Sequence, residues 1–355
     1  MSLCSSSWVG VAGTVLLLLA GAVAPARSET LNLLIWESYI SPEVIQRWQA
    51  LTHTDVSQVY FDSGDKRDSI LSNPASMIDL AIIENARIGP LGEHGLLSAL
   101  DPQRLPNLTL IDPKWRTACG SYGAAYLWGI DGILYRRDKL AVAPASWPDL
   151  LQPAPWLQGH IAMLKDDDDL LAAPLSFLKR PTNTDNIDDL KRAFAVLKAQ
   201  APSVLTYDYV VTAQRASGFD GKIYMALGYT GDQATLNRNA GGSASWHFAI
   251  PREGSVMWAD CLAVVNRSRH RELALKFINF VNEPENAAEN ALYLKLPTPN
   301  RGALRLLPEA VRADPEIYPS AETMALSQLR GRVPAATLQL RRRIVSALTS
   351  SNDAR

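Results

Sequence analysis

Short apolar segments alternate with helical patterns along the first third of the chain. Residues 31–36 form an apolar run of strand length, and Ser41-Pro42 behind it is typical of a helix start. Apolar side chains then recur at helical spacing, namely Val44, Trp48 and Leu51. Residues 56–61 and 79–83 are further strand candidates, the second almost continuously apolar, as a buried parallel strand tends to be. This order predicts repeated βαβ units.

The alternation of short strands and helices is interrupted in the middle of the chain and resumes toward its end. Residues 126–135 form one β-like run with glycines inside it, which suits a strand that bends or crosses between lobes. Helical patterns follow from Trp147 and over residues 190–197. A strand is then expected over residues 257–265, followed by a helix that ends before Pro284, as in the strand–helix order of the first third. A lobe that is left and re-entered explains this order, and it favours lobes joined by strand-like crossovers.

The start of the chain predicts an export signal. Residues 9–24 are apolar apart from Gly and Thr, and small residues offer cleavage after Ala24, Ala26 or Ser28. The region before them carries no Lys or Arg, which leaves an uncleaved N-terminal anchor as the alternative. No later stretch approaches the roughly 18 apolar residues of a spanning helix. We therefore expect a signal peptide over residues 1–28 and a soluble mature protein in the periplasm.

Charge and length narrow the possible partners. Loss of the leader removes one Arg, so 35 Lys and Arg fall to 34 against 36 Asp and Glu. This balance argues against a nucleic-acid partner, which needs a basic surface. The roughly 327 mature residues exceed what one core usually supports, so two lobes are expected. Cys119 and Cys261 both follow the leader and could pair in an oxidising compartment, but the sequence leaves this open.

Several catalytic and metal-binding patterns are absent. The five histidines are isolated and show no HExxH spacing, so no zinc site is expected. The GxSxG, P-loop and GxGxxG patterns are also missing. The sequence therefore predicts no enzyme of those classes, no metal and no cofactor.

The acidic run at residues 166–169 has three interpretations. It suits a solvated helix start, where carboxylates favour the macrodipole. It also suits a cation clamp, since residues three apart at a helix start share a face, which would aim Asp166 and Asp169 together. Calcium is the third, but the run lacks the glycine-spaced alternation of an EF-hand loop.

Two pairs of an aromatic and an acid stand out on the expected strands. Alternation along a strand sends Trp258 and Asp260 to one face, and Trp36-Glu37 followed by Tyr39 opens the mature chain. An ammonium gains about 2 kcal/mol over an aromatic face, and its contact with a carboxylate is charge-assisted. Rings and carboxylates at spaced points therefore indicate a slot for an amine.

The chain resembles the periplasmic spermidine/putrescine-binding proteins of ABC importers along nearly its whole mature length. The matching stretches lie at residues 34–39, 126–129, 147–150, 258–263, 277–280, 296–300 and 318–323. The resemblance implies an α/β fold of the type II periplasmic-binding-protein kind, a two-lobed clamp with the ligand in the cleft between lobes joined by crossover segments. We expect one lobe from residues 29–135 and 261–303 and the other from residues 136–260 and 304–355.

The resemblance also implies the ligand site. The implied ligand-binding residues are Trp36, Ser38, Tyr39, Asp166, Asp169, Tyr229, Trp258 and Asp260. In the family, two acids three residues apart hold a terminal amine, and the carboxylate at the position of Asp260 is the principal amine anchor. Tyr229 stands where the family has a tryptophan and keeps a ring. Glu37 joins this set from its place beside Trp36.

The rim of the implied site departs from the family. Glu84 and Ala86 replace a serine and a tyrosine. Leu296 replaces another tyrosine, for which Tyr293, one helical turn earlier, is the candidate substitute. Arg330 falls near a family glutamine. If its guanidinium faces the slot, it opposes an ammonium and favours an ω-amino acid such as 4-aminobutyrate or 5-aminovalerate. If it pairs with Glu84 instead, the cleft still accepts amines.

These observations predict a non-enzymatic, monomeric solute-binding protein of the periplasm. It would capture a linear polyamine such as putrescine or spermidine and deliver it to the permease of an ABC transporter. The alternatives are an ω-amino acid as ligand, or a sensing subunit that reports its ligand to a membrane receptor.

Overall fold

The computed structural model describes Met1 and residues 29–215, 219, 221–241 and 245–353 of the 355-residue chain. The expected signal peptide over residues 1–28 therefore lies, apart from Met1, outside the described residues. Within the described part of the chain, none of the helices combines the length and the apolar character that a membrane crossing requires.

Ten strands and fifteen α-helices are observed in the described residues. The strands are β1 Thr30–Trp36, β2 Asp55–Phe61, β3 Leu80–Glu84, β4 Ala124–Arg136, β5 Ile161–Ala162, β6 Val204–Thr206, β7 Met225–Tyr229, β8 Trp246–Ala249, β9 Val256–Val264 and β10 Gln328–Leu329. The helices are α1 Pro42–Thr52, α2 Gly64–Ser72, α3 Asn85–Glu93, α4 Pro113–Cys119, α5 Trp147–Leu151, α6 Asp167–Phe177, α7 Ile187–Gln200, α8 Val210–Arg215, α9 Asp232–Asn239, α10 Arg271–Val281, α11 Pro284–Leu294, α12 Arg301–Leu306, α13 Glu309–Arg312, α14 Ala321–Leu326 and α15 Ala335–Asp353. The strands and helices predicted from the sequence are all found, with bounds that move by a few residues.

The first βαβ unit forms as the sequence predicts. Ser41 caps α1 by accepting a hydrogen bond from the backbone N–H of Glu43 at 3.3 Å, and Pro42 occupies the first turn. Val44 and Trp48 are buried against β1, but Leu51 is 68% exposed. The prediction that Leu51 belongs to the packed face is wrong, because the buried face of α1 is formed by Val44, Ile45 and Trp48, and the last turn leaves Leu51 in solvent.

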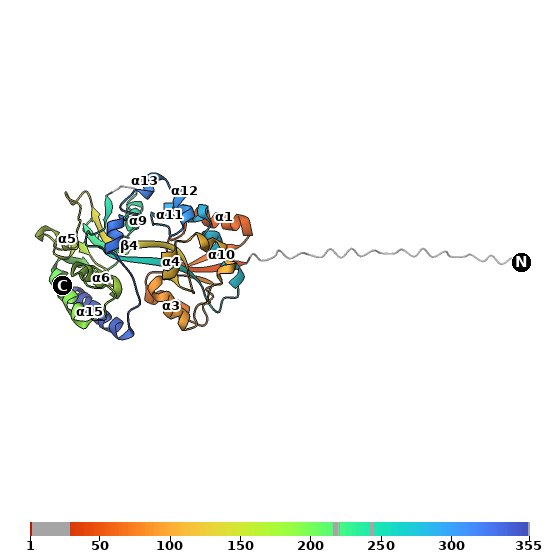
Figure 1. The fold of residues 1–355 in the computed structure, drawn as a ribbon, viewed down its shortest axis with the longest axis horizontal. Helices are drawn as coiled ribbons and strands as arrows, with labels where there is room; N and C mark the ends of the chain where they lie inside the picture. Colours follow the sequence, from red (N-terminus) through yellow and green to blue (C-terminus); the bar gives the residue numbers. More distant parts are fainter. Residues whose placement is uncertain (2–28, 216–218, 220, 242–244, 354–355) are drawn as a thin grey trace.

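One sheet runs through the whole molecule, in the order β2-β1-β3-β9-β4-β7-β5-β6, with β10 added beside β9 and β8 beside β4. β4 pairs with β9 along residues 124–130 and with β7 along residues 131–135. The sheet is therefore divided within β4, which crosses between two halves as its internal glycines predicted. In Figure 1, β4 spans the middle, with α1 and α10 at one end and α5, α6 and α15 at the other.

The core consists of three clusters of buried apolar residues, one of which extends from β1 and β3 to β7 and β8 and so joins the two halves. Apolar residues on the two faces of β1, β3 and β9 form two clusters around α1, α10 and α11 on one side and α3 and α4 on the other. A third cluster joins α5, α6, α7 and α15 to the far end of β4. The observed α/β architecture is that of a two-lobed clamp. The residue boundaries given for the two lobes stay a prediction.

A disulfide joins Cys119 at the end of α4 to Cys261 in β9, with the two Cα atoms 5.8 Å apart. The sequence left this pairing open, since residues 142 positions apart carry no local sign that they meet. The bridge ties α4 to β9 at the residue directly after Asp260.

Candidate functional site

Asp260 is a buried carboxylate in the middle of β9, and it is only 4% exposed. Its Oδ2 atom accepts a hydrogen bond of 2.7 Å from the hydroxyl of Tyr39. Among the described residues, no Lys or Arg forms an ion pair with it. Asp260 thus has a donor that orients it but no cation that neutralises it.

Trp258 and Tyr229 provide aromatic surface near Asp260. Trp258 lies two residues before Asp260 in β9, and Tyr229 is the last residue of β7. Their rings meet edge to face, with centroids 6.1 Å apart and planes at 89°. Trp258 lies in the same apolar cluster as Leu262, whereas Met257 and Ala259 belong to the cluster on the other face. This alternation puts Asp260 on the Trp258 side of the sheet.

A tight turn after β1 brings Tyr39 to Asp260. Ser38 adopts a left-handed conformation with φ of 58°, and the backbone N–H of Tyr39 bonds the carbonyl of Trp36 at 3.3 Å. The carbonyl of Tyr39 in turn accepts a hydrogen bond of 3.0 Å from the hydroxyl of Tyr126. Trp36 packs on Phe61, with ring centroids 4.3 Å apart. The turn is thereby held by β2 on one side and by β4 on the other.

A second group of carboxylates surrounds Arg330. Asp131 and Asp169 are 1% and 4% exposed, and both form ion pairs with the Arg330 guanidinium, the Asp131 contact at 3.0 Å. Asp169 also accepts a hydrogen bond from the hydroxyl of Tyr229. Arg330 is therefore shared between two acids. Tyr229 connects this group to the Asp260 group, because its hydroxyl bonds Asp169 and its ring contacts the ring of Trp258.

Asp166 does not join Asp169 in a clamp. It is the N-cap of α6, and its Oδ1 accepts from the backbone N–H groups of Asp168 at 3.0 Å and Asp169 at 3.3 Å. The remaining acids of the run pair with α15, Asp168 with the buried Arg341 at 2.9 Å and Asp167 with Arg342 at 3.5 Å. The helix-start interpretation of the run thus describes Asp166, while Asp169 alone reaches the Arg330 group.

Glu84 pairs with Arg67 and not with Arg330. The Arg67 side chain is 1% exposed and contacts both Glu84 and Asp68, the latter at 2.8 Å. Glu84 is the register partner of Asp260 between β3 and β9. The expectation that Arg330 pairs with Glu84 is therefore wrong, because Arg67 from α2 already occupies that carboxylate.

Glu37, Leu296 and Tyr293 lie apart from these groups. The Glu37 side chain is 60% exposed and pairs with Arg215 at the end of α8, at 2.9 Å. Leu296 is buried in the core at 3% exposure, and the ring of Tyr293 packs under the Arg238 guanidinium, 5.5 Å from it. The structure does not bring Glu37 or Tyr293 to Asp260.

Burial shifts the protonation of the buried acids. It raises the pKa of Asp260 to about 7, and the neighbouring Glu84 acts in the same direction. It likewise raises the pKa of Asp232 to about 7 and that of Asp131 to about 6, although Arg330 opposes the shift at Asp131. When ionised, Asp131, Asp169 and Asp260 carry more negative charge than the single guanidinium of Arg330 neutralises. A bound cation would restore the balance.

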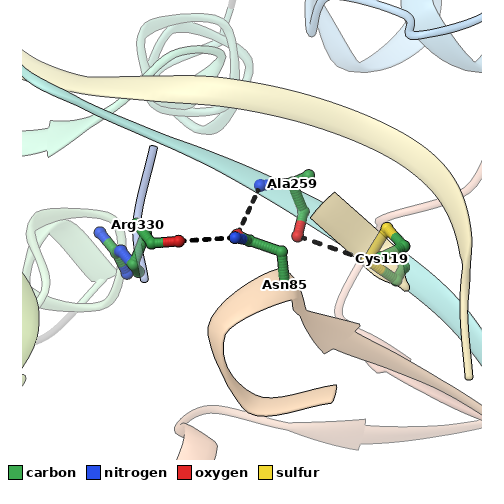
Figure 2. Close-up of a disulfide and its surroundings, with 5 residues drawn as sticks. Asn85, Cys119, Ala259 and Arg330 are labelled. Carbon is green, nitrogen blue, oxygen red and sulfur yellow. Dashed lines mark hydrogen bonds between the residues drawn. A yellow bond between two sulfur atoms is a disulfide. The ribbon is translucent and has the colours of Figure 1, made fainter. Parts of the chain in front are cut away.

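Two residues that the sequence did not single out hold the site together. The side chain of Asn85, directly after β3, accepts from the N–H of Ala259 at 3.1 Å and donates to the carbonyl of Arg330 at 2.7 Å (Figure 2). It therefore fixes the backbone between Trp258 and Asp260 to the segment that carries Arg330. Asp131 carried a sequence signal, since it is the one charged residue inside the apolar run 126–135.

The side chains around Asp260 and Arg330 are suited to binding a ligand. Among the described residues, no group of three or more His, Cys, Asp or Glu side chains is placed to hold a metal ion. Carboxylates beside aromatic rings, with tyrosine hydroxyls to orient them, suit an organic cation.

Comparison with known proteins places the chain in a defined group. Residues 43–319 match the profile of the family described as bacterial extracellular solute-binding proteins. A norspermidine sensor of Vibrio cholerae is 32% identical over 92% of this chain and 90% of its own length. The putrescine-binding periplasmic protein SpuD of Pseudomonas aeruginosa is 29% identical over 90% of this chain and 93% of its own.

The fold is also that of a solved structure. The Tp0655 (TpPotD) lipoprotein of Treponema pallidum superposes with a TM-score of 0.79 at 22% identity, over 91% of this chain and all of its own length. At that identity the similarity concerns the fold alone, and it confirms the two-lobed α/β clamp.

Proposed function

Because the chain belongs to the family of bacterial extracellular solute-binding proteins, we propose that it closes its two lobes on a linear polyamine. Membership in a family of binding proteins confirms that the chain is not an enzyme. It also agrees with the resemblance to spermidine/putrescine-binding proteins, which relatives with those names support.

The observation that carries the proposal is the state of Asp260. This carboxylate is buried, oriented by Tyr39, on the same face of β9 as Trp258, and without an ion pair to any Lys or Arg in the part of the chain that the structure describes. A buried and unpaired carboxylate is costly, and its raised pKa reflects that cost. An ammonium between Asp260 and the aromatic faces of Trp258 and Tyr229 removes the cost and gains a charge-assisted hydrogen bond.

The Arg330 group extends the same argument to a ligand with more than one charge. One guanidinium faces the two carboxylates Asp131 and Asp169, so this group keeps a net negative charge when both are ionised. Asp169 connects to Trp258 through Tyr229. An amine bound at Asp260 therefore has a second acidic environment along the path of its chain, as a polyamine requires.

The same pairing argues against an ω-amino acid. That ligand needs a guanidinium free to bind its carboxylate, whereas Arg330 already contacts two acids. An added carboxylate would stand against Asp131 and Asp169 and be repelled. The amine alternative is the one that the charge balance favours.

Ligand entry requires the lobes to separate. Asp260, Trp258 and Asp169 are at most 7% exposed, so none of them is reachable from solvent in the described arrangement. Hinge movement about the crossing strands is the usual solution for a two-lobed binding protein. The structure corresponds to a closed clamp.

The partner of the closed clamp lies in or at a membrane. Relatives named as periplasmic binding proteins support delivery from the periplasm to an ABC importer. A sensing role has its own support, since the relative at 32% identity is named a sensor. Loss of labelled polyamine uptake in cells that lack the protein supports import, whereas normal uptake supports sensing.

The ligand is tested by isothermal titration calorimetry of the purified mature protein. The panel contains norspermidine, spermidine, putrescine and cadaverine against 4-aminobutyrate and 5-aminovalerate. We expect saturable binding of at least one polyamine and none of the ω-amino acids. Binding of ω-amino acids alone, or of nothing in the panel, rejects the proposal.

A further inference from the structure

A cavity of about 630 Å³ lies outside the Asp260 and Arg330 groups. Its walls come from the C-terminal end of α6, the turn before β9 and the segment between α14 and β10. Its volume is in the range of small-molecule sites, roughly 300–1,000 Å³. None of the residues expected to bind the amine lines it.

The charge of this cavity is opposite to that of the cleft. Lys179, Arg180 and Arg252 line it, together with one acid, Glu253. Glu253 is already engaged, because it accepts hydrogen bonds from the Ser146 hydroxyl and, at 3.3 Å, from the Trp147 backbone. Its contact with Arg252 is long, at 4.0 Å. Arg180 pairs with Asp189 at 3.4 Å, so the excess positive charge of the lining comes from Lys179 and Arg252.

The wall of the cavity is held rigidly at Ser255. Its backbone N–H donates to the Ser327 hydroxyl at 3.1 Å, and its carbonyl accepts from Gln328 at 2.8 Å. The Ser255 hydroxyl is itself closed to solvent, so it lies behind the cavity surface. The exposed cationic side chains of the lining are therefore the groups that a ligand would meet.

We propose that this cavity binds a small organic anion, whose carboxylate or phosphate oxygens pair with Lys179 and Arg252. The ring of Phe177 and the side chain of Leu326 line the same cavity and give an apolar wall for the body of the molecule. The site is independent of the amine cleft and goes beyond polyamine binding.

The cavity nevertheless adjoins the strands that carry the cleft residues. Ser255 directly precedes β9, and Gln328 begins β10 as the register partner of Val256. Asp260 and Arg330 lie further along these same two segments. The two sites therefore share strands but no side chains.

The test is calorimetric titration of the whole protein with inorganic phosphate and with benzoate, each with and without saturating spermidine. We expect one site for at least one anion, occupied equally well in the presence of spermidine. The pair Lys179→Ala with Arg252→Ala should weaken it at least tenfold. Lys198→Ala, at an exposed position of α7 outside the cavity, is the matched control.

The proposal is overturned if neither anion binds, if spermidine displaces the anion, or if the double variant binds the anion as well as Lys198→Ala does. Spermidine titration of the double variant separates the two proposals, because unchanged amine affinity leaves the cleft intact whatever the anion does. Phosphate and benzoate together identify which oxyanion the cavity prefers.

Discussion

The hydroxyl of Tyr39 donates a hydrogen bond of 2.7 Å to the carboxylate of Asp260, across 221 positions of sequence. The bond joins the turn after β1 to the centre of β9. It occupies one oxygen of a buried acid and leaves the acid without a counter-cation. This relationship organises the proposed amine site, because the carboxylate is oriented before any ligand arrives.

Removal of that hydroxyl should weaken amine binding. In Tyr39→Phe, Asp260 loses its donor, and hydrogen bonds to charged groups contribute roughly 1.5–3 kcal/mol. We expect a ten- to hundredfold loss of spermidine affinity by calorimetry. Tyr60→Phe, at a half-exposed position of β2, is the control and should bind normally. Equal affinities of the two variants would exclude a role for the Tyr39 hydroxyl.

Arg330→Gln should destabilise the ligand-free protein and change its selectivity. The substitution leaves Asp131 and Asp169 buried without their guanidinium, a change that costs roughly 3–5 kcal/mol for a broken buried pair. Spermidine should gain affinity relative to putrescine, since its additional ammonium can reach the vacated acids. Urea unfolding and calorimetry measure the two effects.

The matched control for this variant is Arg332→Gln, whose ion pair with Glu93 is exposed on both sides. An exposed pair contributes at most about 1 kcal/mol. If both variants unfold at the same urea concentration, Arg330 does not neutralise a buried acid pair.

Stability without ligand should fall as pH rises from about 4 to 8. The pKa of Asp131 is raised to about 6 and those of Asp232 and Asp260 to about 7, against about 3.9 in the unfolded chain. The folded protein therefore holds more protons than the unfolded chain in this window, and its free energy of unfolding decreases as they are lost.

Spermidine should reverse this trend, because it favours the ionised carboxylates. Thermal midpoints at pH 5.5 and 8, with and without spermidine, give the comparison. A ligand-free midpoint that is higher at pH 8 than at pH 5.5 would contradict the raised pKa values.

Loss of the disulfide should cost stability with little effect on the ligand. The bridge closes a long loop between Cys119 and Cys261, and removal of such a bridge typically costs roughly 2–5 kcal/mol. The double variant Cys119→Ser with Cys261→Ser should unfold at lower urea concentration and still bind spermidine. An unchanged unfolding midpoint would mean that the bridge does not constrain the chain.

Local sequence signals were sufficient for the elements of the fold. The Ser41-Pro42 start, the apolar run at residues 79–83 and the glycine-containing run at residues 126–135 each specify their own structure through capping, burial or strand geometry. The pairing of Trp258 with Asp260 was equally local, since strand alternation alone puts them on one face.

The ion-pair partners of the charged residues could not be predicted from local sequence signals. Arg67 takes Glu84, and Arg330 takes Asp131 and Asp169, through contacts between segments far apart in sequence. Asn85 bridges two further segments. Such contacts depend on the packing of α2, β3 and β10 around β9, and no periodicity records them.

The most direct test of the account is the affinity of Asp260→Asn for spermidine. The substitution keeps the shape of the side chain and the hydrogen bond with Tyr39 but removes the charge. We predict a loss of about 2–5 kcal/mol in binding free energy by calorimetry, with Glu37→Gln at its exposed position unchanged. Wild-type affinity in Asp260→Asn would contradict the claim that this buried carboxylate anchors an amine.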